Sequence, residues 1–294
     1  MILAMIRALF RTMRPKQWAK NVFIFAGLVF DGQLLVIDPL IHTVLGFILF
    51  CLGSSAVYFI NDLADLEQDR KHPTKKNRPL ASGKLPVIVG RIFAVLLPVF
   101  AIGCGFLLST GFGLLLLIYI ALNVLYSFCL KHVPIIDVFV VASGFVLRVG
   151  AGVMLITVER FSPWLYVCTT LLALFIGFGK RRAELRLLSE QAQQHRRVLD
   201  GYTIPYLDQL IIIVSSTTIV AYSFYTFSAE NLPENHLMML TIPFVLYGIF
   251  RYIYLIQVED KGGAPEEIVL ADRPLLFSIL LWGVFSVLVL YNGS

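Results

Sequence analysis

The chain has 294 residues, of which 58% are hydrophobic and only 15% charged, and its mean hydropathy is +0.80. Soluble globular chains are about half apolar and about a quarter charged, so this composition excludes an ordinary soluble protein. The net charge of +5 fits a membrane surface, and nucleic acid is not an expected partner.

Residues 1–20 form an amphipathic, basic stretch that leads into the first of nine long apolar runs. Each run is close to the roughly 20 residues that a helix needs to cross the hydrocarbon of a bilayer, and such lengths exclude barrel strands. We therefore expect an all-α integral membrane protein, a single transmembrane domain over residues 1–294. The expected spans are residues 21–37, 40–61, 86–108, 111–130, 134–157, 162–179, 208–228, 238–257 and 274–292.

Basic residues are distributed unevenly between the loops. When the N-terminus and every second loop are assigned to one side, that side holds most of the 24 Lys and Arg residues, and the opposite loops hold only Arg160. Basic loops favour the cytoplasmic side, so we expect a cytoplasmic N-terminus, a location in the inner or plasma membrane and a cytoplasmic active site. Two long loops on this side, about 62–85 and 180–207, are the expected catalytic loops.

The cysteines and histidines indicate neither a redox nor a zinc site. The four cysteines lie within apolar runs and form no CxxC motif, and the five histidines are scattered without an HxxxH or HExxH pattern.

The stretch NDLADLEQD, residues 61–69, follows directly on the second apolar run. On a continuous helix Asp62, Asp65 and Asp69 would lie on one face, where three like charges repel one another unless a cation neutralises them. Carboxylate oxygens suit Mg²⁺, which commonly binds one or two carboxylates together with substrate phosphates. These aspartates are therefore the candidate catalytic and metal-binding residues. The alternative is a solvated helix end whose carboxylates pair with the basic residues that follow.

A basic run, RKHPTKKNRPLASGKLP, occupies residues 70–86, and its prolines and glycine interrupt any long helix. Lys75 and Arg78 are candidates to bind phosphate oxygens, which arginine does bidentately. Magnesium carboxylates beside a flexible basic loop indicate a diphosphate that is held from two sides.

The motif NDxxDxxxD at residues 61–69 resembles the first aspartate-rich motif of the UbiA-type membrane prenyltransferase superfamily. Residues 72–83, HPTKKNRPLASG, are similar to the segment that follows this motif in the family, and Tyr126 to Lys131 resembles its YxxxK element with one residue more. The resemblance extends over nearly the whole chain. It implies nine transmembrane helices around a central cavity, Mg²⁺ as cofactor, and substrate contacts from Asn61, Tyr126 and Lys131.

Members of the family typically carry a second aspartate-rich motif after helix 6, but this chain has GKRRAELRLL there, residues 179–188. Together with residues 14–25 and 200–210, this departure resembles the decaprenyl-phosphate phosphoribosyltransferase branch. That branch implies a pentosyltransferase with 5-phosphoribosyl 1-diphosphate as donor and a polyprenyl (decaprenyl) phosphate as acceptor, in the synthesis of cell-envelope glycan precursors. The motif then becomes a candidate site for the ribose 5-phosphate, and its candidate residues are Lys180, Arg181, Arg182 and Glu184. Ordinary positive-inside charge is the alternative.

Three further residues complete the candidate substrate-binding set. Lys20 precedes the first span and is a candidate ligand for a substrate phosphate or a lipid headgroup. Asp137 lies near the turn between the fourth and fifth spans and is expected to orient Lys131 or a ribose hydroxyl. Arg148 lies at intramembrane depth, where an ionisable residue is costly and by default a functional candidate. Tight helix packing beside neighbouring glycines is the alternative for Arg148.

The sequence leaves two rival functions open. One is a prenyl diphosphate:aromatic acceptor prenyltransferase of the quinone type, which the basic motif after helix 6 disfavours. The other is a membrane transporter, which should show polar or broken helices at mid-membrane, whereas nearly all charge here lies at one surface. A homo-oligomer is also left open.

Overall fold

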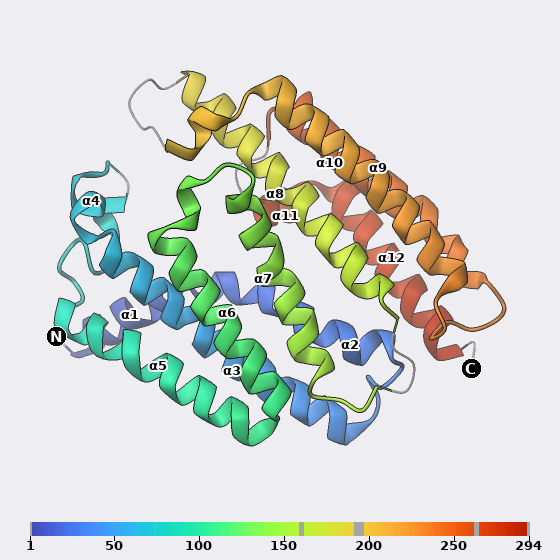
Figure 1. Cartoon of the computed structure of the whole chain (residues 1–294), viewed down its shortest axis with the longest axis horizontal. Helices are drawn as coiled ribbons and strands as arrows, with labels where there is room; N and C mark the ends of the chain where they lie inside the picture. The colour runs from blue at the N-terminus through green and yellow to red at the C-terminus, as the bar shows by residue number, and fades with distance from the viewer. Residues whose placement is uncertain (1, 74, 159–161, 191–196, 262–264, 293–294) are drawn as a thin grey trace. The chain divides into compact units, whose positions relative to one another are not determined.

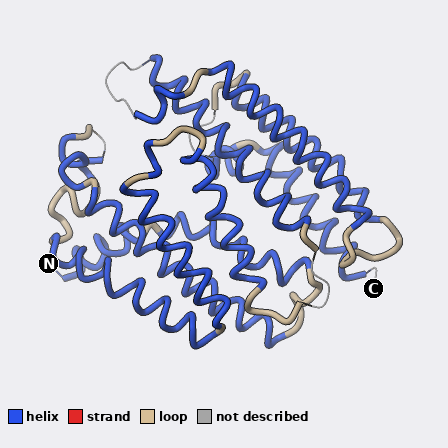
Figure 2. Tube along the Cα trace, in the orientation of Figure 1, coloured by secondary structure: helices blue, strands red, loops and turns tan. Residues whose placement is uncertain are grey.

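The computed structural model describes residues 2–73, 75–158, 162–190, 197–261 and 265–292. Every regular element in this part of the chain is a helix, as Figure 2 shows, which confirms the expected all-α class. The chain divides into two compact units: the first contains residues 1–29, 33–131 and 147–158, and the second contains residues 30–32, 132–146 and 159–294. The prediction of one transmembrane domain over residues 1–294 stays a prediction.

The first unit is built around a long apolar helix, α3. Figure 1 shows α3 beside α5 and α6, and these helices pack closely on one another. The elements are α1 (Ile2–Met13), η1 (Pro15–Ile24), α2 (Phe25–Phe30), α3 (Ile37–Ala64), α4 (Leu66–Lys71), η2 (Lys75–Asn77), α5 (Val87–Leu108), α6 (Thr110–Phe128) and η3 (Leu130–His132). Helix α7 (Ile136–Val153) contributes its end to this unit and its start to the second.

The core of the first unit brings α3, α6, α7 and η1 together. Phe50, Phe112 and Leu116 are completely buried in it. Gly152 of α7 permits the closest approach, because a Cβ atom at this position would lie 1.8 Å from the carbonyl oxygen of Ile24. The small residue therefore allows the backbone of η1 to lie directly against α7.

In the second unit, α8 and α9 pack along one another, and α10 packs on α12, as Figure 1 shows. Phe175, Leu207 and Leu255 are fully or almost fully buried between them. The elements are α8 (Trp164–Glu190), η4 (Arg197–Gly201), α9 (Ile204–Ser228), η5 (Leu237–Thr241), α10 (Ile242–Gln257), α11 (Pro265–Ala271) and α12 (Arg273–Asn292).

Within the described residues, seven segments are long and apolar enough to cross a membrane, so the expected count of nine is not confirmed. The first expected span, residues 21–37, is not one helix, because η1 and the six-residue α2 occupy most of it. The sixth, residues 162–179, lies in α8, which continues into the basic motif and is not among the seven. The expected loop 180–207 is thus helical up to Glu190, and its residues 191–196 lie outside the described part.

Candidate functional site

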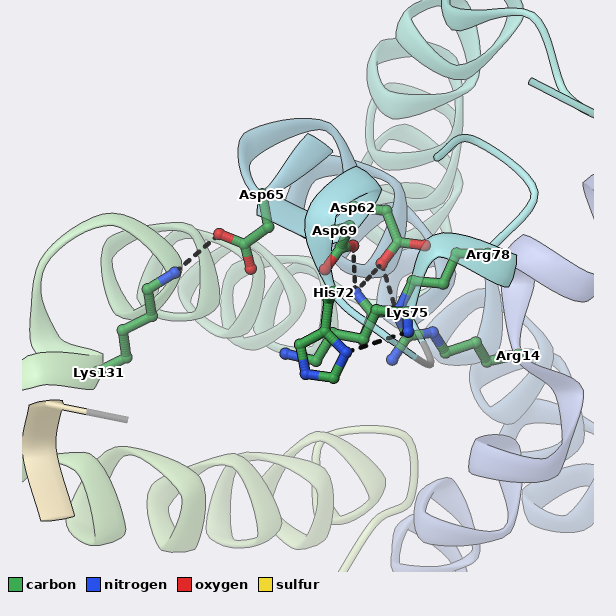
Figure 3. Close-up of polar contacts among 8 residues, drawn as sticks. All are labelled: Arg14, Asp62, Asp65, Asp69, His72, Lys75, Arg78 and Lys131. Carbon is green, nitrogen blue, oxygen red and sulfur yellow. Dashed lines mark hydrogen bonds and ion pairs between the residues drawn. The ribbon is translucent and has the colours of Figure 1, made fainter. Parts of the chain in front are cut away.

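The acidic motif lies at a break between two helices. Helix α3 ends at Ala64, Asp65 follows with φ −94° and ψ 7°, and α4 begins at Leu66. The sequence argument placed the three aspartates on one continuous helix, and this was wrong at Asp65. As a result the Asp65 carboxylate turns toward Lys131, whereas Asp62 and Asp69 face Arg78 (Figure 3).

Each of the three carboxylates meets a cation. Asp62 accepts hydrogen bonds from Arg14 Nη2 at 2.6 Å and from Arg78 Nη1 at 3.1 Å, although its own side chain is only 3% exposed. Asp69, equally buried, accepts from the same Nη1 of Arg78 at 2.6 Å. Lys131 Nζ lies 3.1 Å from Asp65 Oδ1. Two predicted substrate ligands, Arg78 and Lys131, therefore lie against the predicted metal ligands.

The position of Arg78 Nη1 indicates whether the surrounding carboxylates could bind a metal ion. Oxygens of Asp62 and Asp69 converge on this single nitrogen, so the two buried carboxylates meet at a point where a cation already lies. Carboxylate oxygens are the ligands that Mg²⁺ prefers, and in this respect the donor set fits. The third carboxylate is held apart by Lys131, and no three His, Cys, Asp or Glu side chains of the described chain are grouped to hold a metal.

A cavity of about 310 Å³ opens beside the acidic cluster. Four cationic side chains and one carboxylate are among its lining groups, so its charge is positive and suits an anion. The lining residues are Arg11, Arg14, Asp62, Lys75, Asn77, Arg78 and Pro79. The sequence analysis identified Lys75 and Arg78 but not Arg11 or Arg14. The available signal was the basic N-terminal stretch, from which only Lys20 was selected.

The basic motif of α8 lies in a buried ionic network of the second unit. Asp137 is completely buried and accepts hydrogen bonds from Arg181 Nε at 2.6 Å and from the Tyr202 hydroxyl at 2.8 Å. Arg181 also pairs with Glu184. Burial, together with the Asp137 carboxylate, raises the pKa of Tyr202, which keeps its hydroxyl protonated as a donor. Asp137 thus pairs with Arg181, and its expected role in orienting Lys131 stays a prediction.

Arg182 is buried and pairs with half-buried and exposed carboxylates. Its Nε donates to Asp208 Oδ1 at 2.7 Å, its Nη1 donates to the carbonyl oxygen of Ile256 at 2.5 Å, and Asp260 lies 3.6 Å away. The guanidinium groups of the motif are therefore engaged by protein oxygens in this structure. Their role toward a substrate phosphate stays a prediction.

The turn before α7 is held by the end of η4 and the residue that follows it. Ile135 has φ +70°, a conformation that is rare for a β-branched residue and persists only where its surroundings fix it. Its backbone N–H donates to the Tyr202 hydroxyl, and Gly201 lies against Pro134, where a Cβ would approach to 2.3 Å. Tyr202 therefore links this strained turn to Asp137.

Arg148 lies in the core of the first unit. Its Nε donates to Asn21 Oδ1 at 2.8 Å and its Nη2 donates to the Tyr119 hydroxyl at 2.9 Å. The guanidinium carbon lies 4.8 Å from the centre of the Tyr119 ring and 5.4 Å from that of Phe50. The guanidinium is thus engaged within this core, and its role toward a substrate stays a prediction.

The remaining predicted residues are distributed over both units. Lys20 lies in η1, Asn61 directly precedes Asp62 in α3, Tyr126 lies near the end of α6 and Lys180 lies in α8. All four are half-buried. Their substrate contacts stay predictions.

Comparison with known proteins defines the class. The model of the UbiA prenyltransferase family matches residues 21–266, so the chain belongs to this family. Among solved structures, a UbiA homologue from Archaeoglobus fulgidus bound to GPP and Mg²⁺ aligns with a TM-score of 0.72 and 19% identity, covering 96% of this chain and 99% of that one. Such a likeness shows the fold, and the chain is a multi-pass helical membrane protein of this family.

Within this family, the chain is similar to decaprenyl-phosphate phosphoribosyltransferases. A decaprenyl-phosphate phosphoribosyltransferase from Corynebacterium glutamicum is 36% identical over 290 residues, which cover 96% of this chain and 86% of that protein. The protein of the same name from Mycobacterium tuberculosis H37Rv is 31% identical over 287 residues, covering 95% of this chain and 92% of the relative. Both alignments extend over nearly the full length, so they span the segments that hold the acidic and the basic motifs.

Proposed function

We propose that this protein transfers the 5-phosphoribosyl group of 5-phosphoribosyl 1-diphosphate to a polyprenyl phosphate, such as decaprenyl phosphate, and releases diphosphate. The near full-length similarity to decaprenyl-phosphate phosphoribosyltransferases carries the proposal. The acidic cluster and its cationic cavity supply the chemistry for a diphosphate leaving group. The product is a precursor for cell-envelope glycan synthesis.

The acidic cluster is the proposed site of Mg²⁺ binding. Asp62 and Asp69 would hold the ion, with Asp65 as a further ligand, in exchange for their present contacts with Arg78, Arg14 and Lys131. When bound, a divalent ion neutralises charge that develops on departing diphosphate. The solved relative with GPP and Mg²⁺ supports the use of a divalent ion in this fold.

The protein's own cations then hold the donor. Lys75 and Arg78 line the cavity beside Asp62 and present nitrogen donors to diphosphate oxygens. The bond between ribose C1 and the diphosphate oxygen breaks with its electron pair on oxygen, and the lipid phosphate oxygen forms the new bond to C1 from the opposite face. Because the acceptor attacks from the face opposite to the leaving diphosphate, the configuration at C1 should be inverted. Because the acceptor is already an anion at neutral pH, no general base is required.

The basic motif of α8 is proposed to bind the ribose 5-phosphate. Lys180 is half-buried, and Arg181 and Arg182 are buried. Of their carboxylate partners, Asp137 is also buried, whereas Glu184 and Asp208 are half-buried. If this assignment is correct, Lys180→Ala and Arg182→Ala should raise the KM for the donor more than they lower kcat. An unchanged KM in both variants would leave the motif with a structural and topological role.

The basic side of the protein is proposed to face the cytoplasm, with the N-terminus and both catalytic loops on that side. The distribution of Lys and Arg supports this orientation. The bacterial relatives, whose name includes a lipid phosphate, support the proposed location in the inner or plasma membrane.

The deciding experiment incubates membranes containing the protein with Mg²⁺, labelled 5-phosphoribosyl 1-diphosphate and decaprenyl phosphate. Labelled lipid should form with the wild-type protein and not with Asp62→Ala or Asp65→Ala, provided that both variants still fold. Full activity in both variants would reject the acidic site.

Two outcomes would support the rival functions. Transfer from GPP to an aromatic acceptor, with no transfer of phosphoribose, would identify a prenyltransferase, a candidate that the complex of the Archaeoglobus homologue with GPP favours. Accumulation of label inside sealed vesicles without labelled lipid would identify a transporter.

A further inference from the structure

Arg14 reaches the acidic cluster from a different part of the chain. It lies between α1 and η1, directly before Pro15, and its backbone is left-handed, with φ 53° and ψ 61°. A positive φ is uncommon for a residue other than glycine, and it persists where the surroundings fix it, often at functional sites. The side chain bonds Asp62 at 2.6 Å and lies over the Tyr58 ring at 4.6 Å.

The same guanidinium lines the cationic cavity. Arg11, three residues before Arg14, lines the cavity as well. Lys75 and Arg78, which also line it, come from the basic loop after the acidic motif. The N-terminal segment and the basic loop therefore each supply two cations to one cavity. Arg14 and Arg78 both line this cavity and both contact Asp62 of the acidic cluster, and Arg14 is the one that comes from the N-terminal segment (Figure 3).

The negative and positive charges of the acidic cluster are equal in number in this structure. Three aspartate carboxylates meet three cationic side chains, which are Arg14, Arg78 and Lys131. A divalent ion alone would add two positive charges among these cations, which is unfavourable. An ion that arrives with a phosphorylated substrate brings its own negative charge. A bound divalent ion would compete with Arg14 for the Asp62 carboxylate. Ion binding would therefore release the Arg14 guanidinium at the cavity wall.

We propose that Arg14 is a phosphate-binding residue that exchanges Asp62 for a substrate phosphate when a divalent ion occupies the acidic cluster. This deepens the proposed function and rests on it for the identity of the substrate. A phosphate of the donor and the phosphate of the lipid acceptor have the same chemistry, and the experiment separates them.

The test compares Arg14→Gln and Arg14→Lys with a matched control, Arg7→Gln. Arg7 lies in α1, the helix that precedes Arg14, and it is exposed and does not line the cavity. Calorimetry in detergent measures Mn²⁺ binding without substrate, and then binding of inorganic diphosphate with Mn²⁺ present. Steady-state assays measure the KM for 5-phosphoribosyl 1-diphosphate and for decaprenyl phosphate separately.

The exchange predicts changes in opposite directions. Without substrate, Arg14→Gln should bind Mn²⁺ about threefold more tightly, because Asp62 loses a competing cation. With Mn²⁺ present, the same variant should bind diphosphate about tenfold more weakly, because a charged hydrogen-bond donor is lost. Arg14→Lys should lie between Arg14→Gln and wild type, and Arg7→Gln should match wild type.

The kinetic assays assign the phosphate. A higher KM for the donor alone assigns Arg14 to the donor, and a higher KM for the lipid alone assigns it to the acceptor. Unchanged diphosphate binding and KM values, or weaker binding of both Mn²⁺ and diphosphate, would overturn the proposal. If the wild-type protein transfers no phosphoribose, the proposed function fails, whereas the Mn²⁺ and diphosphate titrations still test Arg14.

Discussion

Replacing Arg148 with methionine should destabilise the first unit, because this side chain joins α7 to η1 and α6. Methionine keeps much of the apolar length and removes the charge together with the donors to Asn21 Oδ1 and to the Tyr119 hydroxyl. Each hydrogen bond to a charged group contributes about 1.5–3 kcal/mol. Removing a buried charge also relieves its desolvation cost, so the net loss should be about 3 kcal/mol.

Tyr119→Phe provides the matched comparison. It removes one hydroxyl and leaves the ring beneath the guanidinium, so it should cost about 1 kcal/mol by itself. In the double variant with Arg148→Met, the hydroxyl has already lost its donor, and Tyr119→Phe should add little further loss. The coupling energy between the two substitutions should therefore be about 1 kcal/mol.

The measurement is the free energy of unfolding in mixed micelles, where the denaturing detergent fraction is titrated reversibly. The acceptor KM is measured on the same preparations. If Arg148→Met keeps wild-type stability but raises the KM for decaprenyl phosphate, the packing explanation is refuted, and Arg148 is then a substrate ligand as the sequence first suggested.

Three further predictions concern separate parts of the molecule. Asp65→Ala should reduce labelled-lipid formation at least about a hundredfold with the fold retained; near-normal rates would show that this carboxylate serves only Lys131. Gly152→Ala should lower the free energy of unfolding by about 1–3 kcal/mol, because its Cβ would overlap the carbonyl oxygen of Ile24, whereas Gly103→Ala, with nothing within 4 Å, should leave it equal or higher. Because the pKa of Tyr202 is raised on folding, its contribution to stability should be full below about pH 10 and should decline above it; Tyr202→Phe should therefore show a smaller decline at alkaline pH than the wild type, and identical pH profiles would contradict the reasoning.

Most of the long apolar helices and the aspartates of the acidic site were predictable from the sequence. The apolar run of α3 and the motif at its end stand together in the chain, and Arg78 follows within the next segment. The sequence predicted that the aspartates bind Mg²⁺ and that Arg78 binds phosphate, with pairing between the carboxylates and the following basic residues as the alternative; the structure joins Asp62 and Asp69 through Arg78.

The break in the first expected span was not predictable from apolar length. Asn21 in η1 donates to Ser54 and accepts from Arg148, residues that are remote in the sequence. These contacts, with the close approach at Gly152, hold the segment as a ten-residue 3₁₀ helix, which is unusually long for this type. Tertiary contacts here override a local pattern that favours a continuous span.

The basic motif shows a second limit of local patterns. The sequence of residues 180–184 shows the cations of the motif. It does not show which carboxylates from distant parts of the chain pair with them. Asp137 and Asp208 belong to other helices, and both pair with arginines of the motif. Arg14 was missed for the same reason, since its partner Asp62 is 48 residues away.

The buried pair of Arg181 and Asp137 has a consequence for how this protein can vary during evolution. Loss of Arg181 alone would leave the buried charge of Asp137 without its cation, at a cost of about 3–5 kcal/mol, and loss of Asp137 alone would leave Arg181 with only the less buried Glu184, whereas joint replacement by apolar residues is often tolerated. Positions 137 and 181 should therefore change together in related sequences. Arg186 and Asp260, which are 3.6 Å apart and nearly half exposed, should drift independently.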